Sequence, residues 1–270
     1  MALDPVEAQM EKVRRTVRDL IIFSGQSNME GETERLPDDN SAVEGAWEYR
    51  FLTDSLEPLR HPVGEFIAAD GTPLAEGGRS ALLGSYLGNA NMVPSFCRAY
   101  VRTAGREAVA VHAAKGPTTI ADWLPEGENG AILLRKAKAA AAKVRPERIL
   151  FVWLQGESDQ LAGHSRAYYK AHLLALRDAL RRELGIDLFG VIRVGRFTGT
   201  QKDDGIIEAQ REVCREREDF CMLTEAADEL WAQPRFMNPA SPGHYSCAGQ
   251  ERIGTLAGTA LGEWVRKNRK

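Results

Sequence analysis

The 270-residue sequence lacks long hydrophobic runs and any excess of one charge. Its longest apolar stretches, such as residues 149–154, are far shorter than the roughly 20 residues that cross a bilayer. Lys and Arg total 35 against 38 Asp and Glu, which gives a formal net charge of -3 and no basic field for holding a phosphate backbone. We therefore expect neither a membrane span nor a nucleic-acid partner.

The sequence also lacks the motifs of disulfide frameworks, metal sites and secretion. Its four cysteines form no Cys-x-x-Cys pair, and no zinc-spaced His/Cys set or Gly-rich phosphate loop is present. No Asn-x-Ser/Thr site occurs, and the first 19 residues are charged where a signal peptide would be apolar. These absences predict a cytoplasmic protein with free thiols that requires no metal and no cofactor.

Short apolar runs alternate along the chain with segments of helical periodicity. The runs predict buried strands at 20–23, 108–111, 149–154, 188–194 and 220–223. The periodic segments predict helices at 93–105, 131–144, 165–184, 206–217 and 246–267. Regular alternation implies right-handed crossovers and a parallel sheet covered on both faces. We predict one domain over residues 1–270, an α/β/α sandwich with a mostly parallel five-stranded sheet.

Residues 30–90 interrupt this alternation, since Gly, Pro and acidic residues are spread through them without a clear period. A structureless insertion of this length is unusual inside a compact domain. We expect an excursion of loops and short helices that follows the first strand, covers one end of the sheet and shapes a ligand site. A tolerated surface insertion is the alternative.

Three polar segments lie at or near one edge of the predicted sheet, where ligands bind in parallel α/β folds. Ser27 follows the first strand, Glu157 and Asp159 follow the strand at 149–154, and His244 precedes the last helix. A serine is a weak nucleophile until a histidine takes its proton, and a carboxylate orients that histidine. The three segments therefore contain the residue types of nucleophilic catalysis.

Each residue also has a simpler interpretation. The serine segment lacks the second glycine of a Gly-x-Ser-x-Gly elbow, because position 29 is Met. The acidic pair suits a solvated turn equally well. Among the other histidines, His112 lies in an apolar strand, and His164 is the main rival of His244 because it is close in sequence to Glu157.

Taken together, the segments are more specific. Gly25-Gln26-Ser27-Asn28-Met29, Trp153-Leu154-Gln155-Gly156-Glu157-Ser158-Asp159 and a late His resemble the SGNH-type carbohydrate esterases, in particular the sialic acid 9-O-acetylesterases and family 6 acetylxylan esterases. Residues 113–123 are similar to the Gly-Gly-Thr-Ser-Ile-x-x-Trp segment of that family. The resemblance covers about residues 20–260 and implies the flavodoxin-like SGNH hydrolase fold.

The resemblance also implies roles for the matching residues. Ser27 corresponds to the nucleophile, and its backbone N–H to one donor of the oxyanion hole. Gln155 stands where the superfamily has a side-chain oxyanion donor. The remaining oxyanion donor of the family comes from a second block, which corresponds to residues 88–96 here. Asn91 lies nearest its place, although the glycine that the family has in this block is missing.

His244 matches the general base, but the usual Asp three residues before it is Ser241 here, which cannot act as a charged orienter. The triad carboxylate must then come from elsewhere. Because some members of the acetylxylan esterase branch use the acid of the segment that corresponds to Gln155-Gly156-Glu157-Ser158-Asp159, which we call the third block, we expect Glu157 in that role, with Asp159 in reserve.

These residues predict a serine esterase that removes O-acetyl or other short acyl groups from a small acetylated sugar or oligosaccharide through an acyl-enzyme intermediate. Two alternatives stay open. Ser241 and the unusual second block would also suit a carbohydrate-binding relative without turnover, and a changed leaving group would give a lipase or thioesterase of the same fold. The sugar, the acetylated position and the oligomeric state do not follow from the sequence.

Overall fold

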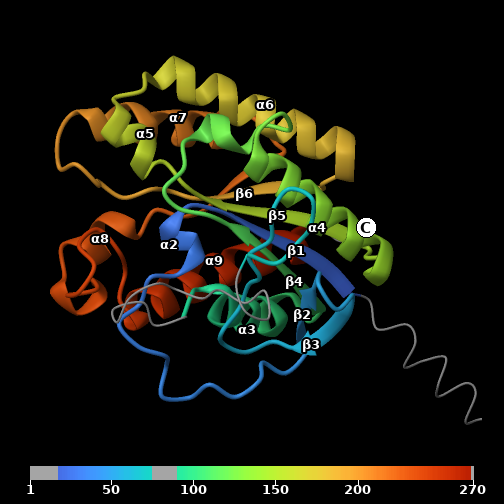
Figure 1. The fold of residues 1–270 in the computed structure, drawn as a ribbon. Coiled ribbons are helices and arrows are strands. Elements are labelled where there is room, and N and C mark those ends of the chain that lie inside the picture. Colours follow the sequence, from blue (N-terminus) through green and yellow to red (C-terminus); the bar gives the residue numbers. More distant parts are fainter. Residues whose placement is uncertain (1–17, 75–89, 269–270) are drawn as a thin grey trace, which may run out of the picture.

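A seven-stranded sheet forms the centre of the molecule in the computed structural model, which describes residues 18–74 and 90–268 (Figure 1). The strand order is β3-β2-β4-β1-β5-β6-β7. All neighbouring strands are parallel except the edge pair of β2 and β3. The five predicted strands correspond to β1 (Arg18–Gly25), β4 (Glu107–Ala114), β5 (Arg148–Leu154), β6 (Leu188–Ile192) and β7 (Phe220–Thr224).

The predicted count of five strands was wrong, because the excursion at 30–90 contributes two more. These are β2 (Ala46–Arg50), which pairs in parallel with β4, and β3 (Ser55–Pro58). The segment Ala46-Trp47-Glu48-Tyr49-Arg50 is no apolar run, since Glu48 and Arg50 alternate with its aromatic residues. Both charged side chains are buried and form an ion pair of 3.1 Å, and burial of charged residues within a strand is rare enough to hide the strand from a hydrophobicity pattern.

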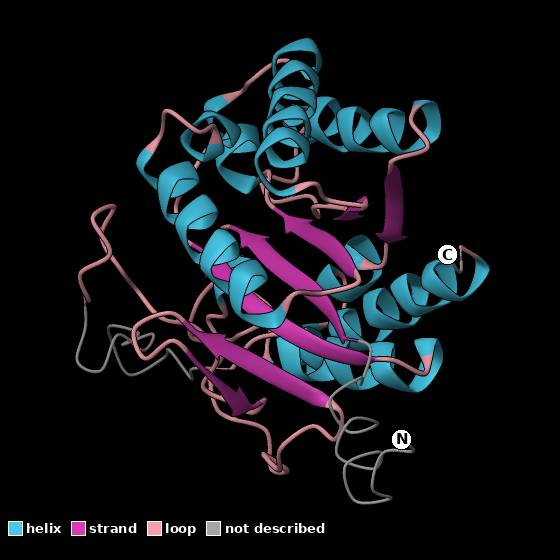
Figure 2. Cartoon of the chain, turned by 90° about the vertical axis from the view of Figure 1, so that its right-hand side faces the viewer, coloured by secondary structure: helices cyan, strands magenta, loops and turns pink. Residues whose placement is uncertain are grey.

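Helices cover both faces of the sheet, as the prediction of three layers requires (Figure 2). One layer contains α3 and α9, and the other contains α4, α6 and α7. Alternate residues of β1 enter the two cores, Ile21 and Phe23 on one side and Leu20 and Ile22 on the other. The helix bounds are α3 (Val93–Ala104), α4 (Glu128–Val144), α6 (Arg166–Leu184), α7 (Lys202–Glu216) and α9 (Cys247–Lys267).

Short helices gather near the carboxyl ends of the strands. They are α2 (Ser27–Glu30), η2 (Ile120–Trp123), α5 (Glu157–Ala162), α8 (Ala227–Trp231) and η3 (Pro234–Phe236). The turn from β1 into α2 needs Gly25, which has a φ of 143° and whose Cβ, if present, would lie 1.9 Å from the carbonyl oxygen of Leu154. A residue without a side chain therefore lets the serine segment leave the sheet directly beside β5.

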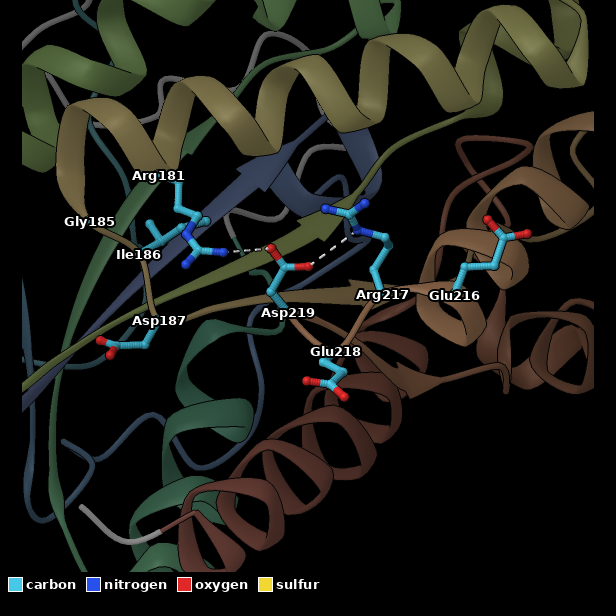
Figure 3. Close-up of a pocket in the computed structure, with 8 residues that line it drawn as sticks. All are labelled: Arg181, Gly185, Ile186, Asp187, Glu216, Arg217, Glu218 and Asp219. Carbon is cyan, nitrogen blue, oxygen red and sulfur yellow. Dashed lines mark hydrogen bonds and ion pairs between the residues drawn. The ribbon is translucent and has the colours of Figure 1, made fainter.

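A charged hollow of about 740 Å³ lies at the opposite edge, where β6 and β7 begin (Figure 3). Its central carboxylate, Asp219, contacts Arg177, Arg181 and Arg217. The hollow lies at the amino ends of these strands, far along the sheet from the serine segment.

Two further observations concern the cysteines and the helices. All four cysteines are free thiols. None of the helices within residues 18–74 and 90–268 has the length and apolar character needed to span a bilayer.

Candidate active site

Ser27 and His244 meet at the carboxyl edge of the sheet. Ser27 is the first residue of α2, directly after β1, and His244 lies in the turn before α9. Their side chains are 2.8 Å apart, from Ser27 Oγ to His244 Nε2. Ser27 is buried at 7% exposure, and the imidazole is 15% exposed. Two residues that are 217 positions apart thus lie at the distance at which a histidine can take the proton of a serine hydroxyl.

The other imidazole nitrogen leads to a carboxylate through a hydroxyl group. His244 Nδ1 lies 2.8 Å from Ser241 Oγ, and Ser241 Oγ donates to Glu32 Oε2 at 3.0 Å. Because the Ser241 proton goes to the carboxylate, its oxygen accepts from His244 Nδ1–H. That tautomer leaves the Nε2 lone pair facing the Ser27 hydroxyl. Glu32 Oε2 itself is 3.4 Å from Nδ1, so its charge acts on the ring directly as well.

Asn238 holds the segment of Glu32 next to the turn of His244. Asn238 donates from its side-chain amide to the Glu32 carbonyl oxygen at 2.7 Å, and its backbone N–H donates to the His244 carbonyl oxygen at 2.8 Å. One asparagine therefore ties the segment that follows α2 to the turn that contains the histidine.

Glu157, the expected triad acid, does not contact His244. Its Oε1 accepts from the Asn28 side-chain amide at 2.8 Å, and Oε2 is buried without a hydrogen-bond partner among the described residues. Burial raises the pKa of this carboxyl group, which favours its neutral form. Asn28 also bonds the Gly243 carbonyl and the Tyr245 N–H. Glu157 thus supports the histidine turn through Asn28 and is no orienter of the imidazole.

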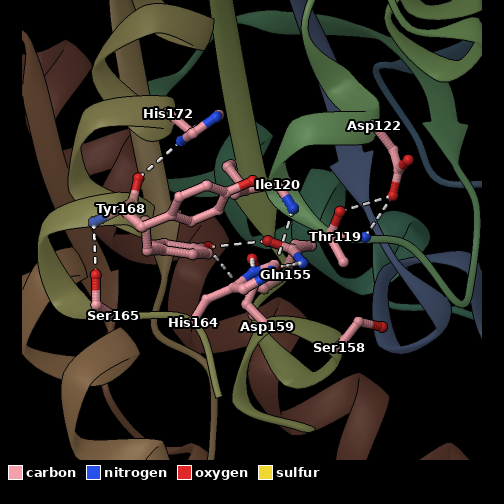
Figure 4. Close-up of polar contacts among 12 residues, drawn as sticks. Thr119, Ile120, Asp122, Gln155, Ser158, Asp159, His164, Ser165, Tyr168 and His172 are labelled. Carbon is pink, nitrogen blue, oxygen red and sulfur yellow. Dashed lines mark hydrogen bonds and ion pairs between the residues drawn. The ribbon is translucent and has the colours of Figure 1, made fainter. Parts of the chain in front are cut away.

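The reserve acid Asp159 and the rival histidine His164 pair with each other (Figure 4). Asp159 Oδ1 lies 2.6 Å from His164 Nδ1. Its Oδ2 accepts from Ile120 N–H at 2.9 Å and from the Gln155 amide at 2.6 Å. Asp159 is fully buried, and its contacts fasten the segment around Ile120 to the third block.

Both side chains expected as oxyanion donors are engaged elsewhere. The fully buried Gln155 amide donates to Asp159, to the Thr118 carbonyl and to Gln26. The Asn91 amide donates to the carbonyls of Glu30 and Val63, each at 3.3 Å. Because these amides have their protons committed inside the protein, the structure does not offer them to a substrate.

Gly116 packs directly against Ser27. A Cβ built on Gly116 would lie 2.7 Å from Ser27 Cβ and 2.8 Å from Ser27 N. The residue belongs to the segment similar to the family's Gly-Gly-Thr-Ser-Ile motif, and only a glycine permits this approach. The Ser27 N–H itself lies in the first turn of α2, where helical N–H groups have no intrahelical acceptor.

Sequence reasoning missed Glu32, Ser241 and Gly116 as parts of this arrangement. Two signals were present. Ser241 keeps the three-residue spacing to His244 at which the family has its acid, and acidic residues recur at positions 30, 32 and 34 directly after the serine motif. A hydroxyl group at the acid's position can relay to a carboxylate from another segment, and only the folded chain shows which carboxylate is within reach.

The sequence matches one known family over most of its length. Residues 17–262 match the family described as carbohydrate esterase, sialic acid-specific acetylesterase. No curated protein shows significant similarity to the chain.

Solved structures of the same fold are similar over nearly the whole chain. A protein from Arabidopsis thaliana has 18% identity and a TM-score of 0.59, over 90% of this chain and 97% of its own. NanS has 13% identity and a TM-score of 0.60, over 92% and 98%. A carbohydrate acetylesterase from Xanthomonas citri has 15% identity and a TM-score of 0.55, over 92% of this chain and 56% of that one.

Proposed function

The chain belongs to the sialic acid-specific acetylesterase family of carbohydrate esterases and is a carbohydrate acetylesterase of the SGNH type, and we propose that Ser27, His244 and Glu32 perform its reaction. The observation that carries this assignment is the 2.8 Å contact between Ser27 Oγ and His244 Nε2, continued through Ser241 to Glu32. These contacts support the roles of Ser27 as the nucleophile, His244 as the base and Glu32 as the charge that stabilises the imidazolium.

The reaction begins when Ser27 Oγ attacks the carbonyl carbon of an acetyl ester while its proton passes to His244 Nε2. The tetrahedral intermediate collapses, the bond to the sugar oxygen breaks, and that oxygen takes the proton from Nε2. This leaves acetylated Ser27 and a free sugar hydroxyl. His244 then removes a proton from water, the water oxygen attacks the acetyl group, and acetate leaves as Ser27 regains its proton.

Glu32 and Ser241 stabilise the imidazolium that forms in each half-reaction. Ser241 Oγ accepts a hydrogen bond from Nδ1–H and so fixes the tautomer, while the negative charge of Glu32 lies 3.4 Å from the same nitrogen. A carboxylate at this place acts as a triad acid does, without becoming protonated.

The Ser27 backbone N–H is our proposed oxyanion donor. It belongs to the residue that forms the covalent bond, so it lies beside the developing negative charge. Gln155 and Asn91 are not included, because their amides are bonded inside the protein.

The proposed substrate is a small O-acetylated sugar or oligosaccharide, with an O-acetylated sialic acid as the first compound to test. The family's description names sialic acid. The intact contact from serine to histidine to carboxylate favours turnover over the alternative of a binding protein without catalysis.

The test is acetate release from an O-acetylated sialic acid and from p-nitrophenyl acetate by the Ser27→Ala variant. We expect a loss of more than about 1,000-fold in kcat with an unchanged fold. Ser158→Ala is the matched control, because Ser158 is a serine of the neighbouring third block whose side chain points away from Gln155 and Asp159 (Figure 4). Full activity of Ser27→Ala would refute the proposal.

A further inference from the structure

Glu30 is an acidic side chain buried three residues after the nucleophile, and the mechanism above does not use it. It ends α2 and is 6% exposed. Its Oε2 accepts a hydrogen bond of 2.8 Å from the Gly116 N–H. The helix that begins with Ser27 therefore holds, through its last residue, the glycine that packs against Ser27.

The segment that starts at Gly116 is fastened at its far end by the third block. The Gln155 amide donates to the Thr118 carbonyl, and Asp159 accepts from the Ile120 N–H. Glu30 supplies the anchor at the near end, next to the reacting serine. A shift of this near end changes the space beside Ser27, since the Gly116 backbone lies at close contact with it.

Lys115 supplies the positive charge that accompanies Glu30. Its Nζ is 3.9 Å from Glu30 Oε1 and 4.6 Å from the centre of the Phe66 ring. The lysine side chain is half exposed, so it can be replaced without opening the core.

We propose that Glu30 is a positioning residue, whose ionised carboxylate, with Lys115 as its counter-ion, holds Gly116 at the place where Ser27 reacts fastest. The inference rests on the proposed function, because it takes Ser27 as the nucleophile. It adds a second carboxylate that must be ionised for full activity, besides the one next to His244.

The surroundings of Glu30 bring its ionisation into the neutral range. Burial raises its pKa to about 7, against the opposing effects of Lys115 and of the Gly116 N–H, while the charge of Glu32 adds to the rise. His112 contacts the carbonyl of Met29, next to Glu30, and burial lowers its pKa to about 4. His112 is therefore neutral where Glu30 titrates, and Lys115 and Glu32 are the charges that set the titration.

The first measurement is the pH dependence of kcat/KM for the wild type and for Glu30→Gln. If the histidine base must lose a proton and ionised Glu30 raises activity about tenfold, the wild-type acid limb is steeper than that of the variant, and the ratio of their kcat/KM values falls from about ten at pH 8 toward one at low pH. The glutamine oxygen can still accept from Gly116, but without charge. We expect kcat at pH 8 to fall about tenfold, with KM nearly unchanged.

The second measurement replaces the counter-ion. Lys115→Met keeps the apolar stem and removes the charge that lowers the pKa of Glu30, so the acid limb should move to higher pH. In the Glu30→Gln background the same change should not move the limb. Lys138→Met is the matched control, because Lys138 is equally exposed and pairs with Glu183 at the surface; its limb should match the wild type.

Equal slopes in the wild type and Glu30→Gln would overturn the proposal, and so would a Lys115→Met shift that persists without Glu30. Both results leave the assignment of Ser27 intact if Ser27→Ala is inactive. An active Ser27→Ala would instead overturn the proposed function itself.

Discussion

Replacing Glu32 by Gln removes the charge beside His244 while it keeps the size of the side chain. The carboxylate oxygen is 3.4 Å from His244 Nδ1. Two unit charges at that separation attract by about 5 kcal/mol at an effective dielectric constant of about 20. The two side chains are 15% and 22% exposed, so solvent screening reduces this to about 2–3 kcal/mol.

This energy acts when the imidazole is charged, which is the case in the transition state. At about 1.4 kcal/mol for each factor of ten, we expect Glu32→Gln to lower kcat about 100-fold. KM for p-nitrophenyl acetate should change little, because the neutral ground state does not feel the charge. Steady-state kinetics at pH 8 measures both constants, and circular dichroism shows whether the fold is kept.

Asp38→Asn is a suitable control for this variant, since Asp38 is an acid of the same excursion whose side chain is 95% exposed and pairs only with Arg35 among the described residues. Its kcat should equal that of the wild type. A Glu32→Gln enzyme within threefold of the wild type would show that another group orients His244, and the reasoning from geometry to role would be wrong.

Three further predictions concern residues around this centre. Glu157→Gln should keep kcat within about threefold of the wild type, because a neutral side chain can still accept a hydrogen bond from Asn28. Glu157→Ala should lose about 1–3 kcal/mol of unfolding free energy in urea denaturation. An inactive Glu157→Gln enzyme of normal stability would show that Glu157 is the triad acid after all. Gly116→Ala should lower kcat at least about tenfold and lower the free energy of unfolding by about 1–3 kcal/mol, because the new Cβ would lie 2.7 Å from Ser27 Cβ. Unchanged kinetics would contradict the close approach of Gly116 to Ser27. Glu30→Gln should have a higher free energy of unfolding than the wild type at pH 8, by up to about 3 kcal/mol. The pKa of Glu30 is raised from 4.5 to about 7 in the folded state, so the stability of the wild type falls as the pH rises through that window. The difference should vanish near pH 4, and a variant that is less stable than the wild type at pH 8 would contradict this prediction.

The sequence predicted the parts of the fold that depend on apolar patterning. The strands at 20–23 and 149–154 and the helix at 165–184 were confirmed within a few residues, because burial on both faces leaves a continuous apolar run and one-sided burial leaves a helical period. Strand β2 escaped this reasoning, since its buried Glu48 and Arg50 form an ion pair and give the segment the residue pattern of a surface strand.

For the site, the sequence predicted which residues meet but not what surrounds them. Ser27 and His244 lie at the edge where strand order places them. The choice of Glu157 as acid followed from its family position, yet its backbone position turns the carboxylate toward Asn28. The link from Ser241 to Glu32 joins side chains that are 209 residues apart, and a contact of that range is decided by how two loops pack, which no local pattern records.

Covalent trapping shows directly whether Ser27 is the nucleophile. The wild type is incubated with a serine-directed organophosphonate and digested, and mass spectrometry locates the adduct. We expect one adduct, on Ser27, that forms much more slowly in His244→Ala and is absent in Ser27→Ala. An adduct on another serine, or equal labelling rates with and without His244, would contradict this assignment.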